Sequence, residues 1–356
     1  MYTNEEINLI VLSRLDLSYG IVKFLLSDFQ SSQPDFENRK DYLIKTLTCG
    51  VYNKVKSLFC DGDFRANTVK ELDEKGIKCV TYFSPDYPET LKNIDTPPVT
   101  LYCIGDTRLL KSNCFSVVGS RRSTPKALAD CNKISGEITS AFTVVSGLAD
   151  GADSAALEGA LDAGGKVISV LAGGFDNVYP ASNRGLFDKV CKFGLAVSEY
   201  PPETLCKPYY FPLRNRIIAG LSRGTLIISA GEKSGALITA EYALEYGRDV
   251  FAFPYNIGVP SGKGCNALIK KGACLTENIL DIFKEFGVDL NKPVQRVQLS
   301  DDERAVYEEI KNEGESFLPR VAQKLGKPPY ALIPIITSLQ IKKLVKSLGG
   351  NRYTAL

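Results

Sequence analysis

The sequence predicts an α/β fold built on an extended, Rossmann-like, doubly wound parallel sheet. Between residues 78 and 287, short runs rich in β-branched residues alternate with segments of helical length. These runs are nearly all apolar, which is typical of parallel strands covered by helices on both faces. We expect strands at residues 115–118, 143–145, 167–171, 195–198, 225–229 and 249–253.

Two smaller parts flank the sheet region. Residues 1–80 predict a helical N-terminal module, which opens with a capping box at Thr3 and Glu6. Residues 81–288 hold the Rossmann-like domain, and Pro293 with its polar neighbours predicts a linker. Residues 296–356 predict three helices and a hairpin that turns at Gly349-Gly350-Asn351, a combination typical of a C-terminal winged-helix-like domain.

Composition excludes several classes of function. The 356 residues hold 43 Lys and Arg against 41 Asp and Glu. This balance argues against a uniformly basic surface for nucleic acid and leaves room only for a local basic patch. The chain has no His, which removes Ser-His-Asp and Cys-His catalysis and His-ligated metals. None of the ten Cys forms a C-x-x-C pair, so we expect reduced thiols, no metal and no cofactor.

The same sequence predicts a location. No apolar run approaches the ~20 residues that a spanning helix needs, and the polar N-terminus is unlike a signal peptide. We therefore expect a soluble, cytoplasmic protein with no membrane partner.

The turn after the first predicted strand of the sheet is a candidate anion site. Gly119, Ser120 and Arg121 stand there and open a helix, so backbone amides and a guanidinium lie close together. A plain strand-to-helix turn with solvated arginines explains these residues equally well. Neither G-x-G-x-x-G nor a P-loop motif occurs, so dinucleotide binding and P-loop hydrolysis are poorly supported.

A second candidate segment, residues 207–222, interleaves aromatic and cationic residues just before an expected helix. Phe211 offers a ring on which a base can stack, at roughly 1–3 kcal/mol per base, beside Arg214, Asn215 and Arg216. For Arg216, a structural ion pair is an equal alternative, because Arg214 and Arg216 cannot face the same way on one helical turn.

A third segment follows the fifth predicted strand. Ser234 and Gly235 open another helix, whose amides suit a phosphate. An ordinary N-cap by Ser234 explains that pair as well.

Together these segments resemble the DNA-processing protein A family, also called DprA or Smf. The resemblance covers residues 85–285 in the family's order and spacing, and its motifs include Val118-Gly119-Ser120-Arg121, Ser146-Gly147-Leu148-Ala149, Phe211-Pro212-x-Arg214-Asn215-Arg216 and Ser234-Gly235-Ala236-Leu237-Ile238-Thr239. It implies a protein that binds single-stranded DNA, forms a homodimer and loads the RecA recombinase in natural transformation and homologous recombination, so that incoming DNA is protected. By position, the DNA-binding residues are Gly119, Ser120, Arg121, Phe211, Arg214, Asn215, Arg216, Ser234, Gly235 and Thr239.

Two other functions remain open at this point. One is an enzyme, a Rossmann-like nucleotide phosphoribohydrolase, but the P-G-G-x-G-T-x-x-E motif of such enzymes is absent and residues 172–175 match only its two glycines. The other is a transcription factor that reads duplex DNA with the winged helix. The leading prediction is a binding protein without catalytic residues.

Overall fold

The computed structural model describes residues 2–15, 17, 19–28, 36–288, 300–342 and 344–355. The chain forms two compact units, Met1–Val288 and Asp289–Leu356. The linker predicted around Pro293 lies outside the described residues.

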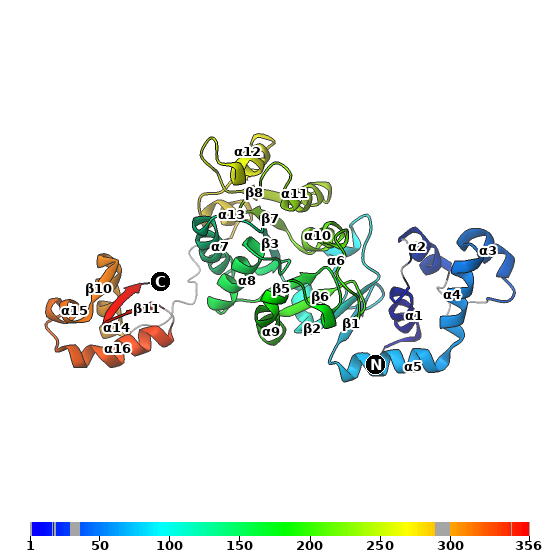
Figure 1. Cartoon of the computed structure of the whole chain (residues 1–356), viewed down its shortest axis with the longest axis horizontal. Helices are drawn as coiled ribbons and strands as arrows, with labels where there is room; N and C mark the ends of the chain where they lie inside the picture. The colour runs from blue at the N-terminus through cyan, green and yellow to red at the C-terminus, as the bar shows by residue number, and fades with distance from the viewer. Residues whose placement is uncertain are drawn as a thin grey trace. The chain divides into compact units, whose positions relative to one another are not determined.

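A nine-stranded sheet forms the centre of the first unit, in the order β1-β2-β6-β5-β4-β3-β7-β8-β9 (Figure 1). All pairs from β6 to β9 are parallel, whereas β1 and β2 add an antiparallel edge. The predicted fold class is confirmed, and each of the six predicted strands lies within two residues of its expected position. The strands are β1 Lys78–Thr81, β2 Thr100–Gly105, β3 Cys114–Val118, β4 Thr143–Ser146, β5 Val167–Leu171, β6 Leu195–Ser198, β7 Gly224–Ile227, β8 Asp249–Ala252 and β9 Cys274–Leu275.

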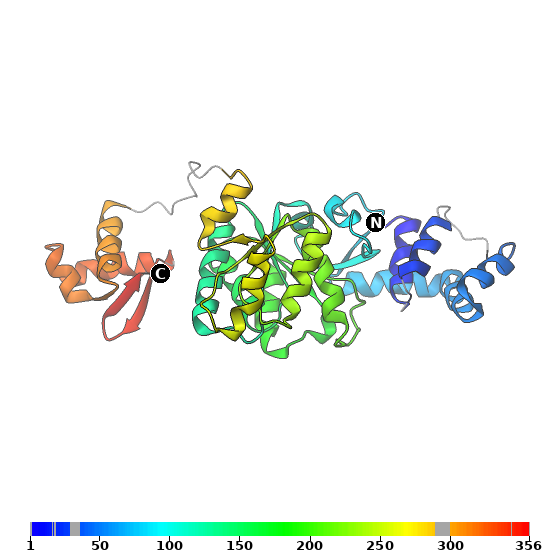
Figure 2. The same cartoon turned by 90° about the horizontal axis from the view of Figure 1, so that it is seen from above.

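Helices cover both faces of this sheet, as Figures 1 and 2 show. One face packs on α7, α8, α9 and α13 around Phe115 and Val117, and the other packs on α6, α10, α11 and α12 around Val118 and Ile227. Strands buried on both sides explain why the sequence shows apolar runs there instead of alternation. The helices are α6 Glu89–Lys92, α7 Pro125–Ile138, α8 Ala152–Asp162, α9 Arg184–Phe193, α10 Tyr210–Leu221, α11 Gly235–Glu245, α12 Lys263–Lys270 and α13 Ile279–Glu285.

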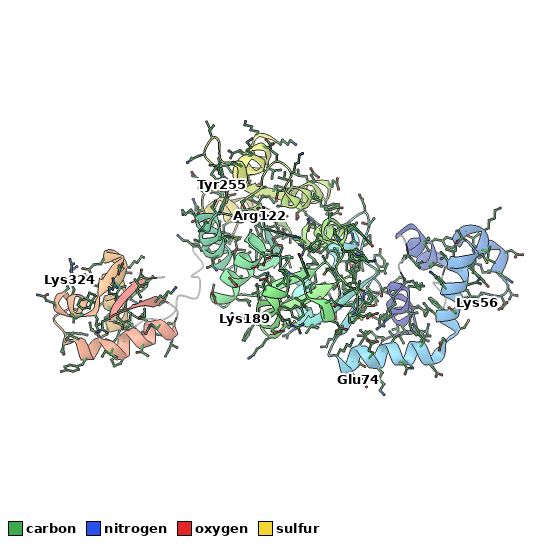
Figure 3. All side chains as sticks on the ribbon, in the orientation of Figure 1. Lys56, Glu74, Arg122, Lys189, Tyr255 and Lys324 are labelled. Carbon is green, nitrogen blue, oxygen red and sulfur yellow. The ribbon has the colours of Figure 1, made fainter. Side chains whose placement is uncertain are left out.

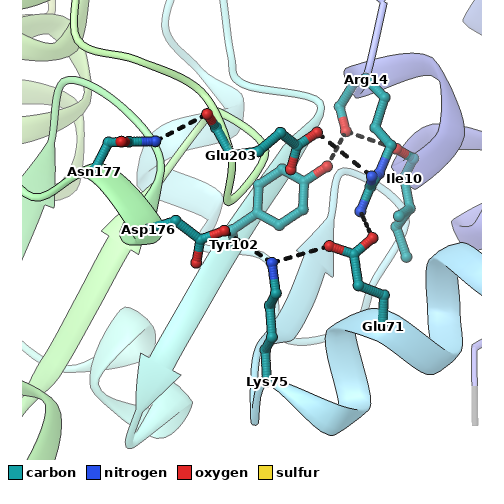
Figure 4. Close-up of polar contacts among 9 residues, drawn as sticks. Ile10, Arg14, Glu71, Lys75, Tyr102, Asp176, Asn177 and Glu203 are labelled. Carbon is teal, nitrogen blue, oxygen red and sulfur yellow. Dashed lines mark hydrogen bonds and ion pairs between the residues drawn. The ribbon is translucent and has the colours of Figure 1, made fainter.

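Among the described residues, five helices precede the sheet in the same unit: α1 Asn4–Ser13, α2 Tyr19–Asp28, α3 Lys40–Leu47, α4 Cys49–Cys60 and α5 Gly62–Glu74. The predicted capping box of Thr3 and Glu6 starts α1. Arg14 links α5 to the loop after β6 through Glu71 at 3.0 Å and Glu203 at 3.4 Å (Figure 4). Strand β1 begins at Lys78, where the alternating pattern of the sequence begins, and the expected boundary at residue 80 falls inside this strand.

In residues 300–342 and 344–355, the second unit has three helices and a three-stranded antiparallel sheet of order β10-β12-β11. Val306, Ile310, Leu332 and Leu339 form the centre of its own apolar core. The hairpin expected at Gly349-Gly350-Asn351 joins β11 to β12. The elements are α14 Asp301–Glu313, β10 Glu315–Phe317, α15 Leu318–Lys324, α16 Pro329–Ile341, β11 Val345–Gly349 and β12 Arg352–Ala355.

Candidate nucleic-acid interface

A cavity of about 380 Å³ opens at the carboxyl edge of the parallel strands. Its walls are the turn after β3, the first turns of α10 and the start of α11, which follows β7. Strand β3 lies between β4 and β7, and the chain leaves it in one direction through β4 and returns on its other side as β7. The cavity therefore occupies the topological switch point, where open α/β sheets bind ligands. We call it the Arg121 pocket.

The turn after β3 is held against the end of β7. The Ser120 amide donates to the Ser229 carbonyl at 2.9 Å, and the Ser123 and Ser229 hydroxyls lie 2.5 Å apart. A Cβ at Gly119 would lie 2.7 Å from the Cβ of Ala152, so only glycine lets β3, β7 and α8 approach this closely. The turn is therefore a rigid support for the residue that follows it.

Arg121 projects from this turn over an aromatic ring. Its guanidinium carbon lies 4.7 Å from the centroid of the Phe211 ring, and the Tyr179 ring meets the same phenyl edge-on at 5.7 Å. Arg121 and Arg122 are exposed, and no ion pair of either occurs in the part of the chain that the structure describes. Arg122 is labelled in Figure 3. Exposed guanidinium groups beside a planar ring suit a phosphate and a base together.

Helix α10 begins at Tyr210, which corrects the expectation that the aromatic and cationic segment precedes a helix. Pro212 is tolerated because it stands in the first helical turn, where its missing N–H has no intrahelical partner to lose. Phe211, Arg214 and Asn215 consequently share one helical face, toward the pocket, whereas Arg216 points elsewhere.

Arg214 forms part of the pocket floor and is only 4 % exposed. Its Nη1 donates to the carbonyls of Gly147 and Val170, each at 2.5 Å, and Nη2 lies 4.0 Å from Asp153 Oδ2. A Cβ at Gly147 would lie 2.1 Å from Arg214 Nη1, so glycine is required where the guanidinium packs on the backbone.

Burial has the largest effect on the pKa values of Asp153 and Arg214. It raises the pKa of the Asp153 carboxyl, although Arg214 and backbone N–H groups lower it in part. Burial also lowers the pKa of the Arg214 guanidinium, which remains far above neutrality in proteins. Arg121, Arg122 and Arg214 against the single carboxylate of Asp153 leave the pocket positive.

Arg216 lies outside the pocket. Its Nη2 donates to both oxygens of Glu199, at 2.5 and 2.6 Å, and its side chain is 9 % exposed. The alternative considered for this residue, a structural ion pair, is the arrangement that the structure has. Arg216 is therefore a predicted DNA-binding residue that does not line the Arg121 pocket.

The start of α11 closes the pocket on its remaining side. The Ser234 hydroxyl accepts from the Ala236 amide at 3.3 Å, which makes Ser234 an ordinary N-cap. The Asn215 amide donates to the Gly235 carbonyl at 3.2 Å, so the two helices that carry these residues are joined. Gly235 and Thr239 also line the cavity, at the positive end of the helix dipole.

Nine of the ten predicted residues thus surround one cavity, and Arg216 does not. Sequence reasoning missed Arg122 and Asp153 as lining residues. Both lie next to residues that the sequence pattern did single out. Arg122 follows Arg121 directly, and Asp153 lies just past the turn after β4, which neighbours β3 in the sheet.

Comparisons with known proteins agree on one family. Residues 78–287 match the sequence model described as DNA recombination-mediator protein A. The chain is 42% identical over 214 residues to DNA processing protein DprA of Bacillus subtilis, which covers 60% of this chain and 72% of that protein. It is 34% identical over 279 residues to protein Smf of Escherichia coli, which covers 74% of each.

Two solved structures agree with this family. The X-ray structure of DNA processing protein A from Streptococcus pneumoniae aligns with a TM-score of 0.68 at 34% identity, over 80% of this chain and 98% of that one. A structure of the Helicobacter pylori protein, described by its single-stranded DNA binding mode, aligns with a TM-score of 0.54 at 29% identity, over 59% of this chain and 95% of that one. Among the described residues, no helix is long and apolar enough to cross a bilayer.

Proposed function

This chain belongs to the DNA recombination-mediator protein A family, and from that premise we propose that it binds single-stranded DNA in the Arg121 pocket and delivers the strand to a recombinase. The Helicobacter pylori relative is described as binding single-stranded DNA, and a likeness at 29% identity supports the same ligand class here.

The observation that carries the proposal is the guanidinium of Arg121 at 4.7 Å from the Phe211 ring, at the mouth of a positive cavity. Phosphate groups of a strand meet Arg121 and Arg122, while an unpaired base stacks on the planar surface beside them. The N-terminus of α11 adds partial positive charge on the opposite wall. These contacts tolerate any base, so the binding is independent of sequence.

We further propose that the pocket binds without catalysis. Its one carboxylate, Asp153, is buried and lies beside Arg214, and the chain holds no His. The rival function, a nucleotide phosphoribohydrolase, would release free base from a nucleoside monophosphate. Chromatographic detection of that base would favour the rival.

The remaining parts of the proposal concern partners. We propose a cytoplasmic homodimer that hands single-stranded DNA to the RecA recombinase during natural transformation. An exposed edge supports self-association: β9 ends the sheet, and Leu275 and Leu280 are 44 % and 51 % exposed there.

We assign the second unit to the winged-helix class, because a hairpin follows its three helices.

The experiment is fluorescence anisotropy with labelled oligonucleotides over a salt series, comparing wild type with Arg121→Glu. We expect at least tenfold weaker binding to every single-stranded sequence, and a salt slope smaller by ~0.7 for each phosphate that the variant no longer binds. Arg223→Glu is the matched control, because Arg223 is also exposed and lies 5.2 Å from a phenyl centroid, that of Phe286, at the start of β7. Wild-type affinity in Arg121→Glu would refute the site.

A further inference from the structure

A second cavity, of about 480 Å³, lies against the other face of helix α10. At 100° per residue, Leu213 and Arg216 point away from the face that Phe211 and Asn215 present to the Arg121 pocket, and Tyr210 lines the second cavity beside them. The N-terminal helical part closes this cavity through residues 12–15, 17 and 22. We call it the Tyr209 cavity, and the proposed function assigns it no role.

Its mouth is an aromatic platform beside a cation. The rings of Tyr200 and Tyr210 are 4.0 Å apart between centroids, and Tyr209 meets Tyr210 edge-on at 4.7 Å. The Lys207 ammonium lies 5.7 Å from the Tyr209 ring centroid, and Tyr209 is 53 % exposed. No ion pair of Lys207 occurs within the described ranges. An open ring next to an unneutralised cation is the pairing that proteins use for a base and its phosphate.

The deeper wall offers hydrogen-bond donors that lack acceptors. Arg216 Nη1 and Arg14 Nε are buried and have no partner among the described residues. Buried donors are nearly always satisfied. Both nitrogens are covered in the free chain, so a rotation of each guanidinium is needed before a ligand in the cavity supplies the missing acceptor. The same wall carries the carboxylates of Glu199 and Glu203, already engaged by Arg216 and Arg14. These carboxylates repel an anion, so the part of a ligand that reaches this wall must be neutral and must carry a hydrogen-bond acceptor.

We propose that the Tyr209 cavity takes a nucleobase, whose ring lies on Tyr209 with its carbonyl oxygens toward the arginines, while its phosphate rests on Lys207. Two ligands carry a base and a phosphate in this arrangement. One is a further base of the strand held in the Arg121 pocket, across the first turns of α10, and that source rests on the proposed function. The other is a free mononucleotide.

The absence of Trp from the chain permits a direct test. Tyr209→Trp creates a single indole at the mouth of the cavity, and a stacked base quenches its fluorescence. Tyr42→Trp is the matched control, because Tyr42 is 51 % exposed on α3 and does not line either cavity. The probes are oligo-dT and dTMP, since thymine carries two carbonyl acceptors. Each probe is titrated into both variants, with and without Arg121→Glu.

We expect quenching by at least half in Tyr209→Trp and none in Tyr42→Trp. Quenching by oligo-dT that Arg121→Glu abolishes identifies the strand as the source. Quenching by dTMP that Arg121→Glu leaves unchanged identifies a free nucleotide, and this result stands even if the chain binds no DNA. Lys207→Glu should weaken either quench about tenfold.

The proposal is overturned if neither probe quenches Tyr209→Trp while anisotropy still shows oligo-dT binding that depends on Arg121. That outcome excludes the Tyr209 cavity as a base-binding site and leaves the proposed function intact. Equal quenching of Tyr42→Trp overturns it as well, because the signal would then not arise from stacking in the cavity.

Discussion

Two arginines on helix α10 stand two residues apart and are both buried, yet their surroundings differ. Arg214 is held by neutral acceptors, the carbonyls of Gly147 and Val170 and the Asn215 amide oxygen, with its nearest carboxylate at 4.0 Å. Arg216 is held by both oxygens of Glu199. A direct carboxylate contact cancels most of an arginine's field, whereas carbonyl contacts leave it positive. The comparison teaches that the partners of a buried arginine, more than the arginine itself, decide how positive the cavity beside it is.

The largest expected effect is on stability. Arg214→Leu leaves the buried Asp153 carboxylate without a cation and should cost about 3–5 kcal/mol. Arg216→Leu should cost less, about 2 kcal/mol, because Glu199 keeps 24 % of its side chain in water. Urea unfolding followed by circular dichroism measures both.

A double variant supplies the control for that pair. Arg214→Leu with Asp153→Leu removes both charges, so most of the lost stability should return. A larger loss for Arg216→Leu than for Arg214→Leu would contradict the comparison.

A smaller effect is expected from the backbone that supports Arg214. Gly147→Ala forces the guanidinium off the Gly147 carbonyl, since the new Cβ would lie 2.1 Å from Nη1, and should cost about 1–3 kcal/mol. Gly185→Ala is the control, because nothing lies within 4 Å of its Cβ position on α9, and it should be neutral or slightly stabilising. Equal stability of the two variants would show that Arg214 is not fixed there.

The smallest effect is on pH dependence. Because burial raises the pKa of Asp153, the folded chain holds this proton to higher pH than the unfolded chain does. The stability it contributes is present below the ordinary Asp pKa of about 3.9 and is lost as the pH rises through the folded value. Protonation also removes the only carboxylate among the lining residues of the Arg121 pocket, so oligo-dT affinity should fall with rising pH over the same interval.

Anisotropy titrations from about pH 4 to pH 7 measure this trend. Asp153→Asn should flatten the profile, because it replaces the titrating group with a neutral one. Parallel profiles for the two proteins would mean that Asp153 does not titrate in this range.

Much of the site could be predicted from the sequence, because turns after apolar strands are visible as local patterns. Gly119, Arg121 and Ser234 follow such strands, and parallel strand ends meet at one edge of a sheet. The antiparallel edge strands β1 and β2 were not predicted, since their short runs acquire strand character only by pairing, β2 with β6 and β1 with β2. The partner of Arg216 was equally hidden, because Glu199 comes from a loop after β6 and reaches α10 only in the folded chain.

The sequence by itself determined the six central strands and their order along the chain, through apolar runs of strand length, helices with their own caps, and glycines where backbones must meet. Only the tertiary structure decided the strand order that places Ser120 against Ser229 and the rotation of α10 that turns Arg214, and not Arg216, toward the Arg121 pocket. The physical reason is range. Periodicity and capping act over a few residues, whereas the charge of a pocket depends on groups that folding brings together from distant parts of the chain.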